Sequence, residues 1–242
     1  MEQKSTHTQD NQVKDSEKGM DIAKNTVSSK NQVKEYDVVR PILRGGKLNV
    51  LFVGNSITRH APAEDIGWME DWGMSASCEE NDYVHQTVAA LDKKYGVVNY
   101  CTACCGDWER AYFEDEKIVR WKQARDFNAD ILVVRLGENI WGPLREKLDE
   151  IPLYPHLKKM IDYFNPTGKA KVVVTDLFWP FEGIDKVLRQ VAEDCGYAFV
   201  HISDISEKDE NKAVGEFWHS GVAQHPNDRG MKLISERILE KL

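Results

Sequence analysis

The sequence predicts an α/β fold, a three-layer sandwich in which helices cover both faces of a five-stranded parallel sheet. The first observation is a set of short, apolar, β-branched runs bounded by Gly or polar residues, which is typical of strands buried on both faces. The second is helical periodicity between these runs. Strands that alternate with helices favour a parallel sheet with right-handed crossovers, as in flavodoxin-like folds.

Five runs are the expected strands, the second being the weakest: Asn49–Val53, Val97–Ala103, Ile131–Leu136, Lys171–Leu177 and Tyr197–Ile202. Five segments have the apolar spacing of helices: Tyr83–Tyr95, Trp108–Asp126, Leu144–Phe164, Ile184–Cys195 and Asp228–Leu242. Pro152 and Pro155 fall inside the third of these segments, where a missing N–H and the ring's bulk should break or kink the helix.

The N-terminal part of the chain reads differently from the rest. Residues 1 to about 35 are polar and aperiodic, and such a segment buries too little apolar surface to offset its ordering entropy. Val38–Lys47 is interpreted as a short bridge whose apolar residues pack on the domain edge. We therefore expect a flexible tail and bridge over residues 1–46 and one folded domain over residues 47–242.

Composition narrows the function classes for this chain of 242 residues. Apolar residues make up 41%, which suits a globular core, and the net charge of −8 argues against nucleic acid or an anionic membrane as partner. No apolar run approaches the roughly 20 residues of a membrane span, and no signal peptide is visible. The expectation is a cytoplasmic protein, with a secreted mature form as the open alternative.

Three polar motifs follow strands or precede a helix, where parallel sheets bind ligands. Gly54-Asn55-Ser56-Ile57-Thr58 follows the first expected strand, and Gly137-Glu138-Asn139 follows the third. His225-Pro226-Asn227-Asp228 precedes the last helix. Each motif alone also fits an ordinary strand end, turn or helix entrance. Together and in this order they supply a nucleophile, an amide donor and a base.

At these motifs the chain resembles the SGNH/GDSL hydrolases, over roughly Leu48–Leu242, and in residues 56–85 a bacterial subgroup of poorly defined substrate. The resemblance implies the same sandwich fold and an ester hydrolase without metal or organic cofactor. It implies Ser56 as nucleophile, His225 as general base, and an oxyanion hole formed by the Ser56 N–H and Asn139. Gly106 is the best candidate for the remaining oxyanion donor, although it is displaced from the family's usual position.

The expected acid of the triad is missing. Family members carry an Asp three residues before the His, and this chain has Val222 there. A backbone carbonyl between Val222 and Gln224 could orient His225 instead, and Glu216 is the candidate side chain. Asp228 more naturally caps the following helix.

The sequence also indicates substrate-binding candidates. Trp141 follows Asn139 by two residues and offers a flat apolar face to a sugar, although core packing explains most Trp residues equally well. Glu109, His60 and Arg110 are further candidates that sequence alone does not rank. The Cys101–Cys104 pair lacks the second pair of a structural zinc site and the context of a redox motif.

These features favour a serine ester hydrolase that removes a small acyl group, such as acetyl, from a carbohydrate or other small ester. The alternative hypothesis is a weak or inactive protein of the same fold that binds glycans, because Val222 replaces the acid. A flavodoxin-like nucleotide binder would need a Gly-rich phosphate loop, and the sequence contains none.

Overall fold

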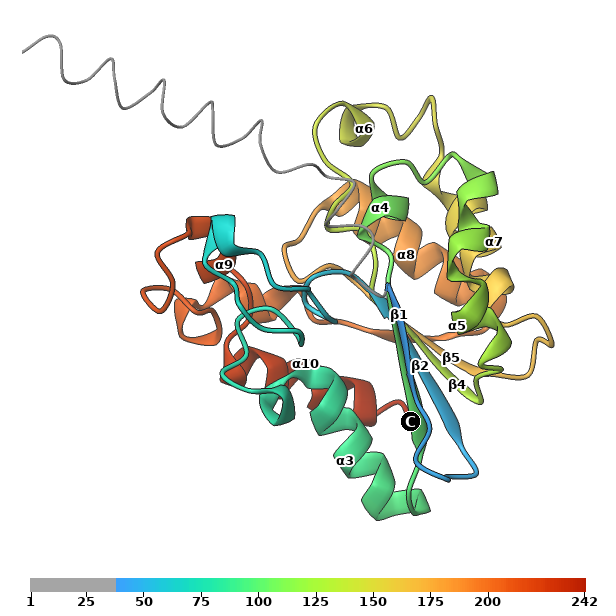
Figure 1. Cartoon of the computed structure of the whole chain (residues 1–242). Helices are drawn as coiled ribbons and strands as arrows, with labels where there is room; N and C mark the ends of the chain where they lie inside the picture. Colours follow the sequence, from blue (N-terminus) through green and yellow to red (C-terminus); the bar gives the residue numbers. More distant parts are fainter. Residues whose placement is uncertain (1–37) are drawn as a thin grey trace, which may run out of the picture. The chain divides into compact units, whose positions relative to one another are not determined.

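Six strands form one sheet in the computed structural model, which describes residues 38–242 (Figure 1). The spatial order is β1-β3-β2-β4-β5-β6, and every neighbouring pair is parallel except β1 with β3. The strands are β1 (Val39–Ile42), β2 (Asn49–Gly54), β3 (Asn99–Cys104), β4 (Ile131–Val134), β5 (Lys171–Thr175) and β6 (Ala198–Val200). The α/β fold with a largely parallel sheet is confirmed.

The strand β1 corrects two expectations. It pairs antiparallel with β3, Val39 opposite Ala103, so the sheet has six strands rather than five and is mixed. It also lies in the segment interpreted as a bridge, and the compact unit begins at Val38 rather than at residue 47. An edge position explains why a strand can contain Pro41, since only one side of an edge strand needs ladder hydrogen bonds. The tail expected over residues 1–37 lies outside the described residues.

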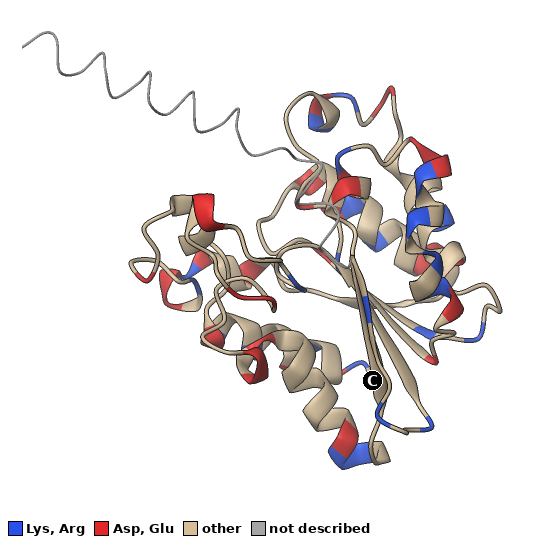
Figure 2. Cartoon of the chain, in the orientation of Figure 1, with Lys and Arg blue, Asp and Glu red and all other residues tan. Residues whose placement is uncertain are grey.

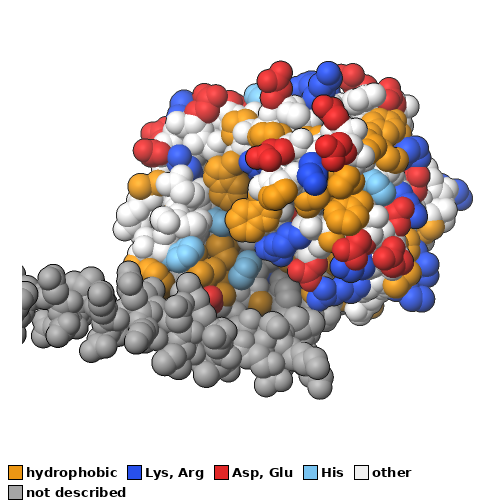
Figure 3. Space-filling view, turned by 90° about the horizontal axis from the view of Figure 1, so that it is seen from above, with side chains coloured by type: hydrophobic (Ala, Val, Ile, Leu, Met, Phe, Trp, Pro, Cys, Tyr) orange, Lys and Arg blue, Asp and Glu red, His pale blue; other side chains and the backbone are white. Residues whose placement is uncertain are grey.

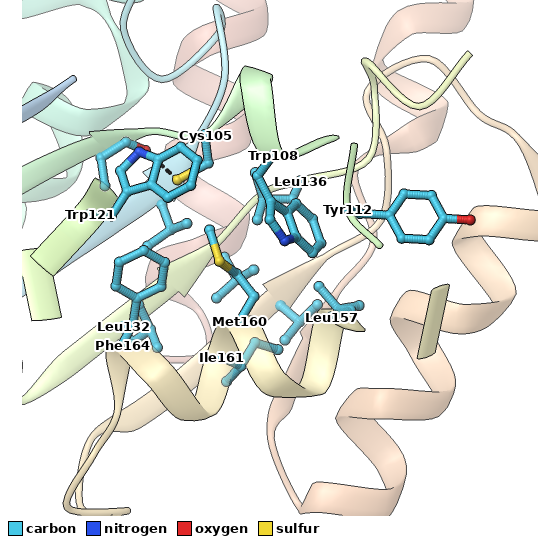
Figure 4. Packing of buried hydrophobic residues seen from close by; sticks show 14 of the residues in the cluster. Cys105, Trp108, Tyr112, Trp121, Leu132, Leu136, Leu157, Met160, Ile161 and Phe164 are labelled. Atoms are coloured by element: carbon cyan, nitrogen blue, oxygen red, sulfur yellow. Dashed lines mark hydrogen bonds between the residues drawn. The ribbon is translucent and has the colours of Figure 1, made fainter. Parts of the chain in front are cut away.

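Alternate residues of the strands pack into two separate hydrophobic cores, one on each face of the sheet. Leu51, Val53, Leu132 and Val134 face the layer that contains α7 (Leu153–Phe164) and α8 (Glu182–Cys195), where Trp108, Trp121 and Met160 pack (Figure 4). Val50, Phe52 and Val133 face the other layer, which contains α3 (Tyr83–Tyr95) and α10 (Asp228–Leu239). Burial on both faces explains why the central strands read as continuous apolar runs.

The helices match the expected segments in part. They are α3 (Tyr83–Tyr95), α4 (Gly106–Glu109), α5 (Lys122–Asp126), α6 (Pro143–Glu146), α7 (Leu153–Phe164), α8 (Glu182–Cys195), α9 (Ser220–Ala223) and α10 (Asp228–Leu239). The break expected near Pro152 is confirmed, because Pro152 is the N-cap of α7. Pro155 lies in the first turn of α7, where no intrahelical N–H bond is lost. The single helix expected over Trp108–Asp126 is wrong: α4, a 3₁₀ segment (Asp115–Trp121) and α5 replace it.

The strand order places the catalytic candidates together. The chain leaves β2 for β3 on one side and then crosses to β4 on the other side, so β2 is the switch point of the sheet. Residues that follow β2, β3 and β4 therefore converge at one edge. Acidic and basic residues are interspersed over the helices and loops around the sheet (Figure 2). Within residues 38–242, no helix is long and apolar enough to span a membrane.

Candidate active site

Ser56 lies on a tight turn directly after β2. The Asn55 carbonyl accepts hydrogen bonds from the N–H groups of Thr58 and Arg59, at 2.9 and 3.0 Å, which closes the turn. A Cβ on Gly54 would lie 1.9 Å from the Thr58 hydroxyl oxygen, so the turn needs glycine at that position. The turn leaves the Ser56 side chain partly exposed at the carboxyl edge of the sheet.

His225 is brought to Ser56 from 169 residues away. The Ser56 Oγ lies 2.8 Å from His225 Nε2, and His225 Nδ1 lies 2.8 Å from the Gly221 carbonyl oxygen. A carbonyl only accepts, so Nδ1 carries the proton and Nε2 accepts from the Ser56 hydroxyl. This tautomer is the one a general base for Ser56 requires.

The group that orients His225 is a main-chain oxygen at a hydrogen-bond distance, as expected, but it belongs to Gly221 and not to Val222–Gln224. The residues before His225 form the single turn α9, and its helical geometry presents the carbonyl four residues back. The Val222 side chain is 1% exposed and packs with Trp68 and Met74. Glu216 does not take the expected position: it is exposed, and Gly221 occupies the Nδ1 hydrogen bond.

Burial governs the charge of the two histidines near Ser56. Burial lowers the pKa of His225 to about 3, and the nearby His60 contributes to the same shift. Burial also lowers the pKa of His60, and the neighbouring Arg110 adds to that lowering. The Trp179 ring packs edge-on against His225, with centroids 4.9 Å apart, and its Nε1 donates to the Gln224 carbonyl. His225 is therefore neutral and held in place at neutral pH.

Asn139 and Gly106 adjoin each other beside the Ser56 turn, as the sequence predicts. A Cβ on Gly106 would lie 3.4 Å from Asn139 Nδ2, so the two residues are in direct proximity. Gly106 is the first residue of α4, so its N–H has no partner within the helix. Asn139 Nδ2 donates one hydrogen to Glu109 Oε2 at 2.5 Å. The second hydrogen of Nδ2 has no acceptor among residues 38–242.

Glu109, expected to be open to a substrate, is buried instead. It is 0% exposed, and its Oε1 accepts from Asn55 Nδ2 at 2.9 Å and from the Gly137 N–H at 2.5 Å. Its other oxygen holds Asn139. Burial raises the pKa of Glu109, and the neighbouring Glu138 raises it further. Glu109 thus orients the amide of Asn139 from the buried side of the site.

The buried side chains of Arg135 and Glu138 complete this hydrogen-bond network, and the sequence analysis did not predict it. Arg135, fully buried, donates to Asn55 Oδ1 and forms an ion pair with Glu138. Asn55 Nδ2 also donates to Glu138 Oε2 at 2.7 Å. A lone Arg within the apolar run Ile131–Leu136 was the available signal, because a buried charge needs a buried partner.

Several exposed or loop residues are candidates for substrate contact. Histidine and hydrophobic side chains gather in a depression at this end of the molecule (Figure 3). Trp141, two residues after Asn139, is 62% exposed, and Trp218, just before α9, is 73% exposed. The Arg110 guanidinium lies 3.7 Å from the Cβ position on Gly106 and pairs with Asp107.

Solved structures share this architecture. A variant of Axe2, an acetyl xylan esterase from Geobacillus stearothermophilus, is 17% identical, with 81% of this chain and 95% of that chain covered and a TM-score of 0.51. LAE5, an alpha/beta hydrolase enzyme from the metagenome of Lake Arreo, Spain, is 16% identical, with 81% and 95% covered and a TM-score of 0.51. A second variant of Axe2, an acetyl-xylooligosaccharide esterase, is 16% identical, with 81% and 94% covered and a TM-score of 0.52.

The chain has the SGNH-type hydrolase fold. At these low identities the likeness establishes the fold and leaves the residue roles to the geometry of the site. No family model matches the sequence, and no curated protein matches it.

No group of three or more His, Cys, Asp or Glu side chains in residues 38–242 is placed to hold a metal ion. Cys101 and Cys105 are fully buried in the core on the α7 and α8 side of this SGNH-type fold. Both therefore pack as small apolar residues.

Replacing Glu216 with Gln is expected to lower kcat by less than about tenfold, because the Gly221 carbonyl already fixes His225 Nδ1. Steady-state kinetics on p-nitrophenyl acetate, with the melting temperature as a control for folding, would measure the effect. A loss of roughly a thousandfold in a folded variant would mean that a carboxylate completes a triad after all.

Proposed function

We propose that the protein is a serine ester hydrolase that removes a small acyl group, acetyl, from a carbohydrate. The observation that supports it most is the 2.8 Å contact between Ser56 Oγ and His225 Nε2, with Nδ1 of the same ring engaged by Gly221. The fold is that of known esterases, and two of the compared structures are acetyl xylan or acetyl-xylooligosaccharide esterases. Exposed Trp141 and Trp218 offer flat faces to sugar rings.

In the proposed reaction, Ser56 Oγ attacks the ester carbonyl while His225 Nε2 takes its proton. The carbonyl oxygen becomes an oxyanion that accepts from Asn139 Nδ2 and from the N–H groups of Ser56 and Gly106. His225 then returns the proton to the leaving alcohol, and an acyl-Ser56 ester remains. Water attacks this ester with the same base, which releases the acid and restores Ser56.

A second candidate function is glycan binding with little or no turnover. The observation that favours it is the partner of His225 Nδ1, which is a neutral carbonyl rather than a carboxylate. A carbonyl fixes the tautomer of the ring, but it stabilises the imidazolium of the transition state less than a full negative charge does.

Hydrolysis of acetylated xylooligosaccharides and of p-nitrophenyl acetate separates the two functions. The proposal expects acetate release that a Ser56→Ala variant lacks, with oligosaccharide affinity retained by that variant. Oligosaccharide binding by both proteins without acetate release would favour the binding function. Turnover of the aryl ester with no release from any acetylated glycan would keep the ester hydrolase and remove the carbohydrate substrate.

The pKa of His225 predicts an unusual acid limb in the pH profile of kcat/KM. A base with a pKa of about 3 stays unprotonated far below the 6.5 of a free imidazole, so kcat/KM should stay level from about pH 8 to about pH 5. The unfolded chain takes up a proton on this histidine below about pH 6.5 and the native state does not, so the free energy of unfolding falls as the pH falls. Profiles of kcat/KM and melting temperature would test this. An acid limb near pH 6.5 with an unchanged melting temperature would contradict it.

A further inference from the structure

One segment, residues 71–77, contacts both of the loops that carry the candidate catalytic residues; we call it the brace. The Met74 N–H donates to the Ser56 carbonyl at 2.9 Å. The next residue, Ser75, donates through Oγ to the Val222 carbonyl at 2.7 Å. Adjacent residues of the brace therefore hold the nucleophile turn and α9.

The brace is fixed at several points along its length. Asp71 accepts two hydrogen bonds from the Arg59 guanidinium, each at 2.9 Å. The Gly73 N–H donates to the buried Asp82 carboxylate at 3.1 Å. At the far end, Ser77 donates through its N–H and its hydroxyl to Asp228, at 2.8 and 2.6 Å. Asp228 therefore anchors the brace, and the cap of α10 is Asn227.

Ser75 has an unfavourable backbone conformation for its residue type. Its φ is 74°, in the left-handed region that favours glycine, and it is 2% exposed. A glycine would adopt this conformation without strain, but it would lack the hydroxyl. The feature that serine adds at this position is the hydrogen bond to the Val222 carbonyl.

That hydrogen bond acts on the turn that orients His225. A helix of one turn has little stability of its own, so α9 depends on outside contacts. Val222 is held on both sides: its N–H donates to His219 Nδ1 at 3.3 Å, and its carbonyl accepts from Ser75. The Gly221 carbonyl belongs to the same peptide unit as the Val222 N–H, so fixing Val222 fixes the oxygen at His225 Nδ1.

We propose that Ser75 is a positioning residue for the proposed reaction: through Val222 it holds the Gly221 carbonyl at His225 Nδ1, and so selects the tautomer in which Nε2 faces Ser56. Met74 in the same brace sets the position of Ser56. This inference rests on the proposed ester hydrolysis for its kinetic consequence, but the tautomer of His225 can be measured without turnover.

The test compares Ser75→Gly, which removes the hydroxyl and the strain, with Ser75→Ala, which removes the hydroxyl and keeps the strain. Both should lower kcat for p-nitrophenyl acetate about tenfold with KM changed less than about twofold, while the melting temperature falls further for Ala. Long-range ¹H–¹⁵N NMR should show the His225 Nδ1–H form in the wild type and a mixture of tautomers in both variants. Ser206→Ala is the control, since this buried serine also donates to a carbonyl, that of Ser203. It should change neither kcat nor the tautomer of His225.

In a His225→Ala background, Ser75→Gly should lower the remaining rate no further, because the proposed path runs through His225. The inference would be overturned if Ser75→Gly changed neither the tautomer of His225 nor the rate. It would also be overturned if Ser75→Gly lowered the rate by the same factor in the His225→Ala background as in the wild type. A wild type that hydrolyses no ester, but in which Ser75→Gly mixes the tautomers, would remove the proposed function and leave the positioning role standing.

Discussion

Ser56→Ala is expected to lower kcat for an activated ester by about 10⁴-fold or more, because no other group replaces the attacking oxygen. The fold should be unaffected, since the Ser56 side chain is partly exposed and the turn is closed by Asn55, Thr58 and Arg59. Steady-state rates and the melting temperature give the two readouts, and a fluorophosphonate probe should label Ser56 in the wild type.

The matched control is His225→Ala. Ser56 and His225 act as a unit, so the double variant should be about as slow as either single one. Labelling at a different serine, or turnover near the wild-type rate after Ser56→Ala, would exclude Ser56 as the nucleophile.

Glu109→Gln is expected to lower kcat by about 10²–10³-fold, although the side chain touches no substrate. Both oxygens of Glu109 accept hydrogen bonds, and the amide that replaces one of them would face a donor. The Asn139 amide then either loses its partner or rotates, which removes a donor from the oxyanion hole. The melting temperature should fall as well, because an unpaired buried donor costs about 1–3 kcal/mol.

Three variants make this test specific. Asn139→Ala should show a similar loss in kcat, and its combination with Glu109→Gln should add little, because both act on one donor. Glu116→Gln, an exposed glutamate in the neighbouring 3₁₀ segment, should be neutral. If Glu109→Gln raised KM and left kcat unchanged, Glu109 would be a substrate-binding residue, as the sequence suggested.

Much of the fold was predictable because burial on both faces leaves a plain signal. The central strands around Val50–Val53 and Ile131–Val134 are apolar throughout. Apolar runs this short indicate strands buried on both faces, because a buried helix would need a longer run. The strand β1 was missed because Val39–Ile42 contains Arg and Pro, which are acceptable only at an edge. Which segment joins an edge, and in which direction, depends on pairing between distant residues, such as Val39 with Ala103, that local patterns do not contain.

The site was predictable where residue type and strand order determine it. Ser56, Gly106 and Asn139 follow β2, β3 and β4, and parallel strands bring such residues to one edge. The role of Glu109 was not predictable, because a charged residue after a strand usually faces water. The Gly221 carbonyl was missed by one residue, since a turn as short as α9 has no periodicity to reveal it.

The antiparallel edge strand has a practical consequence for attaching the protein to a support or a fusion partner. Because β1 runs against its neighbour, the described chain enters at the same edge as Ser56: the Val38 carbonyl accepts from the Cys104 N–H at the carboxyl end of β3. The last residue lies at the opposite edge, where the Leu242 carbonyl oxygen accepts from Lys171 at the start of β5 (Figure 1). A linker placed after Leu242 therefore points the edge that carries Ser56 away from a surface, whereas one joined immediately ahead of Val38 begins at that edge.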